Sequence, residues 1–478
     1  MDWTLGYYNN ISLKINDIRL LQYYYRIGNG KAITTPAQLE QFRGLKQINY
    51  DVNITFPNPD FTVFDNLIEI FGNLTITGCT IDITGFKLLR IIMGSLNIYN
   101  NTFTTISGFG SLRYVRDMFL ISDTPVTSTS FTDLTIIGSL TIINTSLIGL
   151  PVLDSPSITK LGSITIVGNP YLLSLPEFIY LSTIGPIGSV TLWNDSIIIQ
   201  PGNINIQNNA LLPELPGWNA ITTMGNLFIV DNPLLTALYF ASIVNINTIV
   251  INNNLSLFSL PPFSALTSLG NLVIIKSLFT TLPIFNVPTI GDFIIDTTTI
   301  QYINGFTNLN SIGNFYINNN SLLSVMPSFS SVVSTGLLVV TNNPVFNFPT
   351  FTNLTMIGDI NITNNGISYL PDFYMSSVGY LIITNNPNLT VFPSFPNLIT
   401  IGSLVVNQSS FVVITTKNNM PVFNSVIAIG NIVMDNNTSL VYIQDFTSLH
   451  IGNVLFGYNP NLRLQDYNAV TTVGTISI

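Results

Sequence analysis

Residues 379–398 read Gly-Tyr-Leu-Ile-Ile-Thr-Asn-Asn-Pro-Asn-Leu-Thr-Val-Phe-Pro-Ser-Phe-Pro-Asn-Leu. Leu381 and Ile383 lie two positions apart, the spacing at which side chains of a β-strand point to the same face. The Asn-Asn-Pro that follows predicts a turn, because Asn tolerates left-handed backbone and Pro removes an N–H donor. Leu389, Phe392 and Phe395 then return to an apolar core. The stretch therefore predicts one complete coil of a repeating structure.

The same pattern recurs along the chain, and most copies open with a glycine. Most steps between neighbouring glycines are 21 to 24 residues, and two gaps of twice that length are filled by Asp117 and Asn247. One coil cannot bury its own apolar face, whereas stacked copies can, so the sequence predicts an all-β solenoid of roughly 20 coils with a period near 22 residues. The repeat glycines are Gly72, Gly94, Gly138, Gly162, Gly188, Gly225, Gly270, Gly291, Gly313, Gly336, Gly358, Gly379, Gly402, Gly430, Gly452 and Gly474.

The first 46 residues lack the repeat and are expected to form a partly helical N-terminal cap. Asn16 or Asp17 is a candidate helix cap for a helix ending near Gly28, and Thr35-Pro36 predicts a second short helix ending near Gly44. A cap is expected because the open end of a solenoid exposes an unpaired edge. Residues 47–478 form the repeat domain, with degenerate coils near 186–218 and 403–430.

Composition limits the class of protein. Charged residues make up only 8% of the chain, and the mean hydropathy is +0.47. No run of about 18 apolar residues occurs, so a transmembrane helix is not expected. The N-terminus has neither a basic start nor an apolar stretch, so no conventional signal peptide is expected. The single cysteine, Cys79, excludes a disulfide framework within the chain.

Charge is distributed unevenly. Residues 1–160 carry 11 Lys and Arg against 12 Asp and Glu, whereas residues 161–478 carry 3 against 11. Nucleic-acid binding needs a clustered basic surface, which this pattern does not offer. No charged residue occurs between Thr297 and Gly358. Such a neutral surface indicates burial in an assembly or contact with neutral ligands, unless the composition only reflects a biased genome; both readings stay open.

Asparagines recur about six residues after the glycine. Stacked Asn amides can bond the backbone of the neighbouring coil, so a structural ladder is favoured over a ligand site. Some of these residues also match the glycosylation pattern, as in Asn144-Thr-Ser146 and Asn388-Leu-Thr390, a match that such a composition produces by chance. The predicted ladder consists of Asn100, Asn144, Asn169, Asn232, Asn253, Asn319, Asn343, Asn365, Asn386 and Asn436, with Asp123 and Asp231 in the same row.

The sequence predicts no catalytic, cofactor-binding or metal site. His450 is the only histidine and is interpreted as a strand-edge residue. Paired carboxylates for polysaccharide cleavage should lie about 5 to 10 Å apart, on adjacent coils of a solenoid. Asp292 and Asp359 share a register three coils apart, and Asp292 and Asp296 lie in one strand. Glu177 and Asp372, each after a proline, are many coils apart, so none of these pairs is convincing.

The strand-to-turn segments resemble those of leucine-rich repeats. Leu140, Ile142 and Asn144 form one example, and the fuller phrase from Leu354 to Asn365 is similar to the receptor L-domain of growth-factor receptors and surface proteins. Leu398 to Asn407, Val190 to Asn194 and the opening Pro36 to Ile48 carry the same resemblance, which covers about residues 36–478. It implies a right-handed parallel β-helix with a role in binding or surface architecture. The chain lacks the receptors' cysteines and is far longer, so hormone binding is not carried over.

Three functions follow as hypotheses. The first is a non-enzymatic structural or interaction protein, a rigid component of a larger assembly such as a virion or cell-surface structure, with other protein subunits as partners. The last coil stops in mid-strand at Gly474 to Ile478, an edge expected to pair with further chain or another subunit. The second is a carbohydrate- or protein-binding adhesin, for which Trp193 and Trp218 are candidate exposed aromatics, although packing is favoured for both. The third is a polysaccharide-active enzyme.

Overall fold

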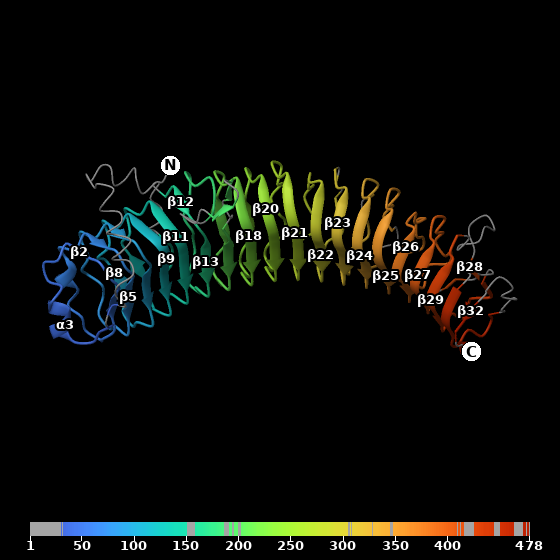
Figure 1. Cartoon of the computed structure of the whole chain (residues 1–478), viewed down its shortest axis with the longest axis horizontal. Helices are drawn as coiled ribbons and strands as arrows, with labels where there is room; N and C mark the ends of the chain where they lie inside the picture. The colour runs from blue at the N-terminus through green and yellow to red at the C-terminus, as the bar shows by residue number, and fades with distance from the viewer. Residues whose placement is uncertain are drawn as a thin grey trace. The chain divides into compact units, whose positions relative to one another are not determined.

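The computed structural model is an all-β parallel solenoid of about 17 coils with a period of about 22 residues, close to the roughly 20 coils expected. Figure 1 shows the long strands lying side by side, each connected to the next by a loop. The chain divides into two compact units, Met1–Gly225 (unit 1) and Asn226–Ile478 (unit 2). The structure describes residues 30–478 except 31, 151–157, 186–190, 194–195, 199–201, 305, 307, 327, 345–347, 409, 412, 415–424, 444–449, 463–471, 475 and 478.

Unit 1 contains the helices of the described residues and most of the short strands. The α-helix α3 spans Pro36–Glu40 and the 3-10 helix η1 spans Phe61–Phe64. The strands that stack on the main sheet are β1 (Ala32–Ile33), β2 (Gln47–Ile48), β3 (Val52–Ile54), β4 (Glu69–Ile70), β5 (Leu74–Thr77), β6 (Ile91–Ile92), β7 (Leu96–Tyr99), β9 (Tyr114–Ser122), β11 (Ile136–Ile143), β12 (Lys160–Leu161), β13 (Ile164–Val167) and β16 (Ile204–Gln207). Smaller strands are β8 (Thr105–Ile106), β10 (Ser128–Thr129), β14 (Thr191–Trp193), β15 (Ser196–Ile198) and β17 (Glu214–Gly217).

Unit 2 is built mainly from eight-residue strands in parallel register. The division between the units falls within β18 (Thr223–Val230). The main strands that follow are β20 (Asn245–Asn252), β21 (Ser268–Ile275), β22 (Thr289–Asp296), β23 (Ser311–Asn318), β24 (Ser334–Thr341), β25 (Met356–Thr363), β26 (Ser377–Thr384), β27 (Thr400–Asn407), β29 (Ala428–Asp435), β31 (His450–Phe456), β32 (Thr472–Val473) and β33 (Ile476–Ser477). Outside this sheet lie β19 (Ala237–Tyr239), β28 (Val413–Ile414) and β30 (Tyr442–Ile443).

Each eight-residue strand buries its second, fifth and seventh residues. In β23 these are Ile312, Phe315 and Ile317, which are at most 2% exposed. The spacing of three between the first two means that Gly313 and Asn314 both face outward, so the strand carries a bulge at positions 3 and 4. Bulges of neighbouring coils stack so closely that a Cβ on Gly336 would lie 2.5 Å from the Gly313 carbonyl oxygen. Close backbone approach is therefore the reason for the repeated glycine.

The side of the core opposite the strands is filled by stacked phenylalanines. In unit 2 the rings of Phe263, Phe285, Phe306 and Phe329 follow one another with centroids 5.8 to 6.1 Å apart. Offset stacks of this kind stabilise a core beyond the area they bury. The residues predicted to return to the core in the first stretch do so, since Leu389, Phe392 and Phe395 are at most 1% exposed. Sequence periodicity therefore identified the core residues both in the strands and on the side opposite them.

The N-terminal end of the described chain is partly helical, as expected. Helix α3 begins after Thr35, whose Oγ1 accepts a hydrogen bond from the Gln38 N–H at 3.3 Å. Gln38 Oε1 in turn accepts from the Thr34 N–H at 2.8 Å, which completes a reciprocal cap. Leu39 is 1% exposed and secures the helix to the first coil. The helix predicted to end near Gly28 lies outside the described residues.

One coil of unit 1 contains an insertion inside its strand. Ile184 bridges Leu161 at position 2, and Ile204 pairs with Ile164 at position 5. The Gly202 N–H donates to the Ile184 carbonyl oxygen at 2.7 Å, so the chain leaves the strand after Ile184 and rejoins it at Gly202. The intervening segment includes β14 and β15, which pair antiparallel.

The insertion changes the predicted boundaries of the degenerate coils. Residues 202–218 form a regular coil that begins with β16, so Gly202 takes the repeat position that had been assigned to Gly188, which lies outside the described residues. Likewise β27 and β29 pair in regular register, as Ser403 with Asn431, although both reach into the predicted degenerate stretch 403–430. The spacing of glycines along the sequence cannot distinguish a segment inserted into a regular coil from a coil whose repeat pattern is degenerate.

Candidate functional site

The predicted asparagine ladder consists of two adjacent rows. The first residue after each eight-residue strand has a positive φ, for example 54° at Asn319 and 57° at Asn342. We call these residues the outer row; the side chains of Asn319 and Asn342 are exposed. The next residue is buried, as Asn320 and Asn343 are at 0% and 2% exposure; we call these residues the buried ladder. Left-handed backbone favours Asn in the outer row, whereas hydrogen bonding favours it in the buried ladder.

Each amide of the buried ladder connects neighbouring coils. Asn343 Oδ1 accepts from the Asn320 N–H at 3.0 Å, and its Nδ2 donates to the carbonyl oxygens of Ile317 at 2.9 Å and Thr341 at 2.7 Å. The same Nδ2 lies 3.2 Å from Oδ1 of Asn365. These bonds satisfy backbone groups at the point where the chain leaves the strand inside the core.

The ten predicted residues divide equally between the rows. In the sequence the two rows look like one, because several coils carry Asn at both positions. The predicted asparagine lies six residues after the glycine when it belongs to the outer row and seven residues after it when it belongs to the buried ladder. Asp123 and Asp231 belong to the outer row, where Asn144 and Asn253 donate to them at 2.7 and 2.6 Å. The buried ladder contains Asn169, Asn232, Asn343, Asn365 and Asn386, and the outer row contains Asn100, Asn144, Asn253, Asn319 and Asn436.

The candidate aromatic ligands do not form an exposed row in the described residues. Trp218 is 1% exposed, its Nε1 donates to the Pro176 carbonyl oxygen at 2.9 Å, and its ring lies 5.9 Å from that of Phe178. Trp218 is therefore a core residue in the phenylalanine stack of unit 1. Trp193 lies in β14, and its side chain is outside the described residues.

The carboxylates considered for catalysis are not brought together as a pair. Strand register places Asp292 opposite Asn314, then Leu337, then Asp359, so three strand spacings separate the two aspartates, about 14 Å. Asp292 and Asp296 stand on either side of Ile294 in β22. Glu177 lies in unit 1 and Asp372 in unit 2. No group of three metal-ligating side chains occurs among the described residues.

The remaining polar candidates occupy ordinary places in the repeat. His450 is the exposed first residue of β31 and pairs in register with Ala428. Cys79 takes the buried-ladder position in its coil, where its N–H donates to Asn101 Oδ1 at 2.9 Å. Burial raises the pKa of the Cys79 thiol to about 12, so the thiol stays protonated and unreactive at neutral pH.

The outward side of the long strands carries the strand residues that do not fill the core. We call it the sheet face; it consists of strand positions 1, 3, 4, 6 and 8. Position 6 is apolar along nearly all of unit 2, with Asn361 as the exception. A period-two reading of each strand could have detected this column, but the glycine repeat and the core dominated the pattern. The column consists of Phe228, Val250, Val273, Ile294, Tyr316, Val339, Ile382, Val405, Val433 and Leu455.

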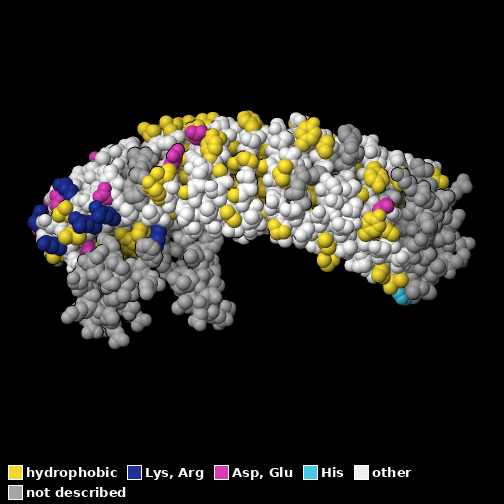
Figure 2. Space-filling view, turned by 90° about the horizontal axis from the view of Figure 1, so that it is seen from above, with side chains coloured by type: hydrophobic (Ala, Val, Ile, Leu, Met, Phe, Trp, Pro, Cys, Tyr) yellow, Lys and Arg dark blue, Asp and Glu magenta, His cyan; other side chains and the backbone are white. Residues whose placement is uncertain are grey.

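Charged groups differ between the units as well. All ion pairs among the described residues lie in unit 1, and Figure 2 shows Lys and Arg gathered over the first coils. The described part of unit 2 contains one lysine, Lys276, and six aspartates. The aspartates are Asp231, Asp292, Asp296, Asp359, Asp372 and Asp435.

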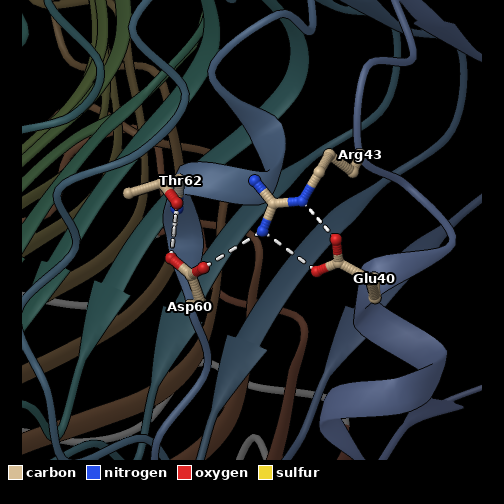
Figure 3. A network of polar contacts seen from close by, with 4 residues as sticks. All are labelled: Glu40, Arg43, Asp60 and Thr62. Atoms are coloured by element: carbon tan, nitrogen blue, oxygen red, sulfur yellow. Dashed lines mark hydrogen bonds and ion pairs between the residues drawn. The ribbon is translucent and has the colours of Figure 1, made fainter.

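One of the unit 1 networks connects the cap to the next coil. Figure 3 shows Arg43 between two carboxylates: its guanidinium contacts Glu40 and donates from Nη2 to Asp60 Oδ2 at 3.3 Å. Asp60 Oδ1 also accepts from Thr62 Oγ1 at 2.6 Å. The hydrogen bond from Arg43 lowers the pKa of Glu40, and the bond from Thr62, followed by that from Arg43, lowers the pKa of Asp60.

Comparison with known proteins yields solved structures alone. No family model matches the sequence, and no curated protein matches it. YopM from Yersinia enterocolitica is 15% identical with a TM-score of 0.38, over 97% of this chain and 99% of that one. The functional domain of InlJ from Listeria monocytogenes is 13% identical with a TM-score of 0.33, over 84% and 72%. A TLR13–ssRNA13 complex is 12% identical with a TM-score of 0.19, over 88% and 86%.

These solved structures are leucine-rich-repeat proteins. At such identities and TM-scores they identify no family and no function for this chain. The fold assignment rests on the chain's own repeat and strand register, as described above. Among the described residues no helix is long and apolar enough to cross a membrane.

Proposed function

We propose that this protein is a non-enzymatic interaction protein whose sheet face in unit 2 binds another polypeptide. The observation that carries the proposal is the apolar column at strand position 6, which continues through successive coils from Phe228 to Leu455 with one interruption. Core packing does not require it, because position 6 points away from the core and unit 1 fills most of the same positions with Thr and Asn. A continuous partly exposed apolar row bordered by polar side chains is typical of a protein-binding surface.

We further propose that the solenoid works as a rigid component of a larger assembly. The charge-poor coils support this, because three successive coils between Thr297 and Gly358 carry no charged residue, and isolated soluble surfaces usually carry mixed charges. A virion or a cell-surface structure would be such an assembly. In this arrangement residues 1–46 cap one end, and residues 47–478 form the repeat domain.

The buried ladder has a structural role in this proposal. Its amides bond to backbone groups of their own and adjacent coils, and Asn343 and Asn365 are each 2% exposed, so a ligand could not reach them without opening the core. The ladder fixes the spacing of coils, and the sheet face supplies recognition.

A photo-crosslinking experiment tests the binding face. A photoreactive phenylalanine at Val339, in the apolar column of unit 2, should form adducts with another protein in the native source material. The matched control carries the same group at Thr165, the corresponding position 6 of β13 in unit 1. Adducts at position 339 and not at 165 are expected. Equal labelling at the two positions, or none at position 339, would contradict the proposal.

A further inference from the structure

Strands β22 to β25 present two carboxylates at the same strand position, with one amide and one apolar side chain between them. Asp292, Asn314, Leu337 and Asp359 follow one another at position 4 in continuous register. Neighbouring strands are about 4.8 Å apart, so about 14 Å separates the outer two. This spacing is too long for a catalytic pair but suits two contacts to one bound chain.

Both carboxylates are oriented by the neighbouring coil. Asp292 Oδ1 accepts from Asn314 Nδ2 at 2.7 Å, and Asp359 Oδ1 accepts from the Tyr380 N–H at 2.7 Å. Each bond uses Oδ1, and neither Oδ2 has a hydrogen bond or ion pair within the described part of the chain. The carboxylates therefore have a fixed orientation and an acceptor oxygen left for a partner.

Between the two aspartates lie Asn314, which is bonded to Asp292, and an apolar patch. Leu337 lies at position 4, and beside it the adjacent position-6 residues are Tyr316 and Val339, which pair in register. All three are partly exposed. An apolar side chain of a partner can lie over these groups while cationic side chains reach the aspartates at either end.

The strands that form this surface contain no described Lys or Arg that could pair with its two carboxylates. The described strands β22 to β25 carry no Lys or Arg, and no ion pair occurs among the described residues of unit 2. In unit 1, by contrast, Lys87 pairs with Asp65 and Arg113 with Asp133, so carboxylates there have partners in the same unit. Charge complementarity therefore favours a partner that supplies the cations.

We infer that Asp292 and Asp359 select an extended polypeptide segment with two Lys or Arg side chains four residues apart and an apolar residue midway. An extended chain advances about 3.3 to 3.4 Å per residue, so residues i and i+4 are about 13.4 Å apart and share a face with i+2. The segment crosses the strands along the stacking direction. Its two cations bond to the aspartates, and its central side chain covers Leu337, Tyr316 and Val339. This inference rests on the proposed function and names the partner's chemistry.

Fluorescence anisotropy with synthetic peptides tests the inference on the full-length protein. The probe is a labelled Ser-rich peptide with two lysines four residues apart and a leucine between them. A control peptide of the same composition has its lysines three residues apart, which places them on opposite faces of an extended chain. We expect the first peptide to bind about tenfold more tightly than the second.

Matched variants separate the two charges from the apolar surface. The double variant Asp292→Asn/Asp359→Asn keeps an Oδ1 acceptor for Asn314 and Tyr380, so the fold should stay intact while binding falls about tenfold and loses most of its salt dependence. The control Asp435→Asn changes a carboxylate on the same sheet face outside the segment, at position 8 of β29, and should bind normally. Val339→Ser should also weaken binding.

The outcomes distinguish this inference from the proposed function. If the double variant binds like wild type while Val339→Ser loses binding, the cationic partner is wrong and the apolar binding face stands. If both peptides bind equally, the spacing argument is overturned. If neither peptide binds the wild-type protein, the inference fails, and the crosslinking experiment at Val339 still decides the proposed function.

Discussion

The two units share one coil architecture and differ in what they present outward. At position 6 of the main strands, unit 1 carries Thr75, Asn97, Thr141, Thr165 and Asn205, with Leu120 as the apolar exception. Unit 2 carries aliphatic and aromatic residues at the same position with one exception. Ion pairs follow the opposite distribution, since those of the described residues are confined to unit 1.

The comparison separates the requirements of folding from those of recognition. Positions 2, 5 and 7 are apolar in both units, except for Thr335 at position 2 of β24, because they fill the core between the strands and the phenylalanine stack. Position 6 is free of that requirement, so its chemistry can differ without a change of fold. A function that depends on the sheet face should therefore belong to one unit, whereas damage to the core should affect both.

The largest expected effect is in the buried ladder. Asn343→Leu in unit 2 and Asn169→Leu in unit 1 should each lower the free energy of unfolding by about 3 kcal/mol or more, because buried backbone N–H and C=O groups lose their partners. Urea unfolding and hydrogen exchange of the affected strands measure the loss. The control Asn342→Gly, in the outer row at φ 57°, should cost less than about 1 kcal/mol. If only one of these two variants lost a large part of its free energy of unfolding, the two units would not depend equally on the buried ladder.

The second effect concerns the stacked bulges. Gly336→Ala should lower the free energy of unfolding by about 2 kcal/mol, because the new Cβ would lie 2.5 Å from the Gly313 carbonyl oxygen and the backbone must shift. Gly110→Ala in unit 1 is the matched control, since the nearest atom to its Cβ is 3.8 Å away. Thermal unfolding compares the two. Equal destabilisation would show that glycine is needed for reasons other than close approach.

The smallest effect is expected for the ion pairs that distinguish unit 1. Arg43→Ala should shift the unfolding midpoint less than either change above, because the pair is exposed and screened by salt. The pKa values of Glu40 and Asp60 are lowered in the folded state, so their contribution is complete only above their ordinary values, at about pH 6, and is lost as the pH falls through the lowered values.

The pH dependence sharpens this last comparison. The midpoint difference between wild type and Arg43→Ala should therefore shrink between about pH 6 and pH 3, and also at high salt. A variant of unit 2 such as Asp435→Asn should show no comparable convergence with salt, because no cation pairs with Asp435 in the described structure. A difference for Arg43→Ala that persisted at low pH would assign its effect to packing of the side chain.

The sequence predicted the fold well because the core repeats strictly. Leu381, Ile383, Leu389 and Phe395 are buried where their spacing placed them, and the parallel register follows from stacked copies of the same pattern. The end of the cap helix was less accurate: α3 ends at Glu40, and Gly44, predicted near its end, lies beyond it at φ 81°. Helix ends depend on local capping geometry that composition describes poorly.

Surface features were harder to predict than the core. The ladder appeared as one row, because neighbouring asparagines such as Asn319 and Asn320 satisfy different needs with the same side chain. The apolar column was missed, because Val and Ile at position 6 look like additional core residues until the bulge fixes which residues face inward. Packing was favoured for Trp218 from the sequence, and its 1% exposure confirms this.

The insertion of unit 1 shows how this fold can acquire new parts. Removal of residues 186–202 would join Thr183-Ile184-Gly185 to Asn203-Ile204-Asn205-Ile206-Gln207, which reproduces the pattern of Ser311–Asn318. The two ends of the insertion meet at the outward bulge, so the buried positions on either side keep their regular pairing with the preceding coil. The glycine of a coil is thus a position at which a solenoid of this kind can gain or lose a segment on its outward face while the strand register on either side is kept.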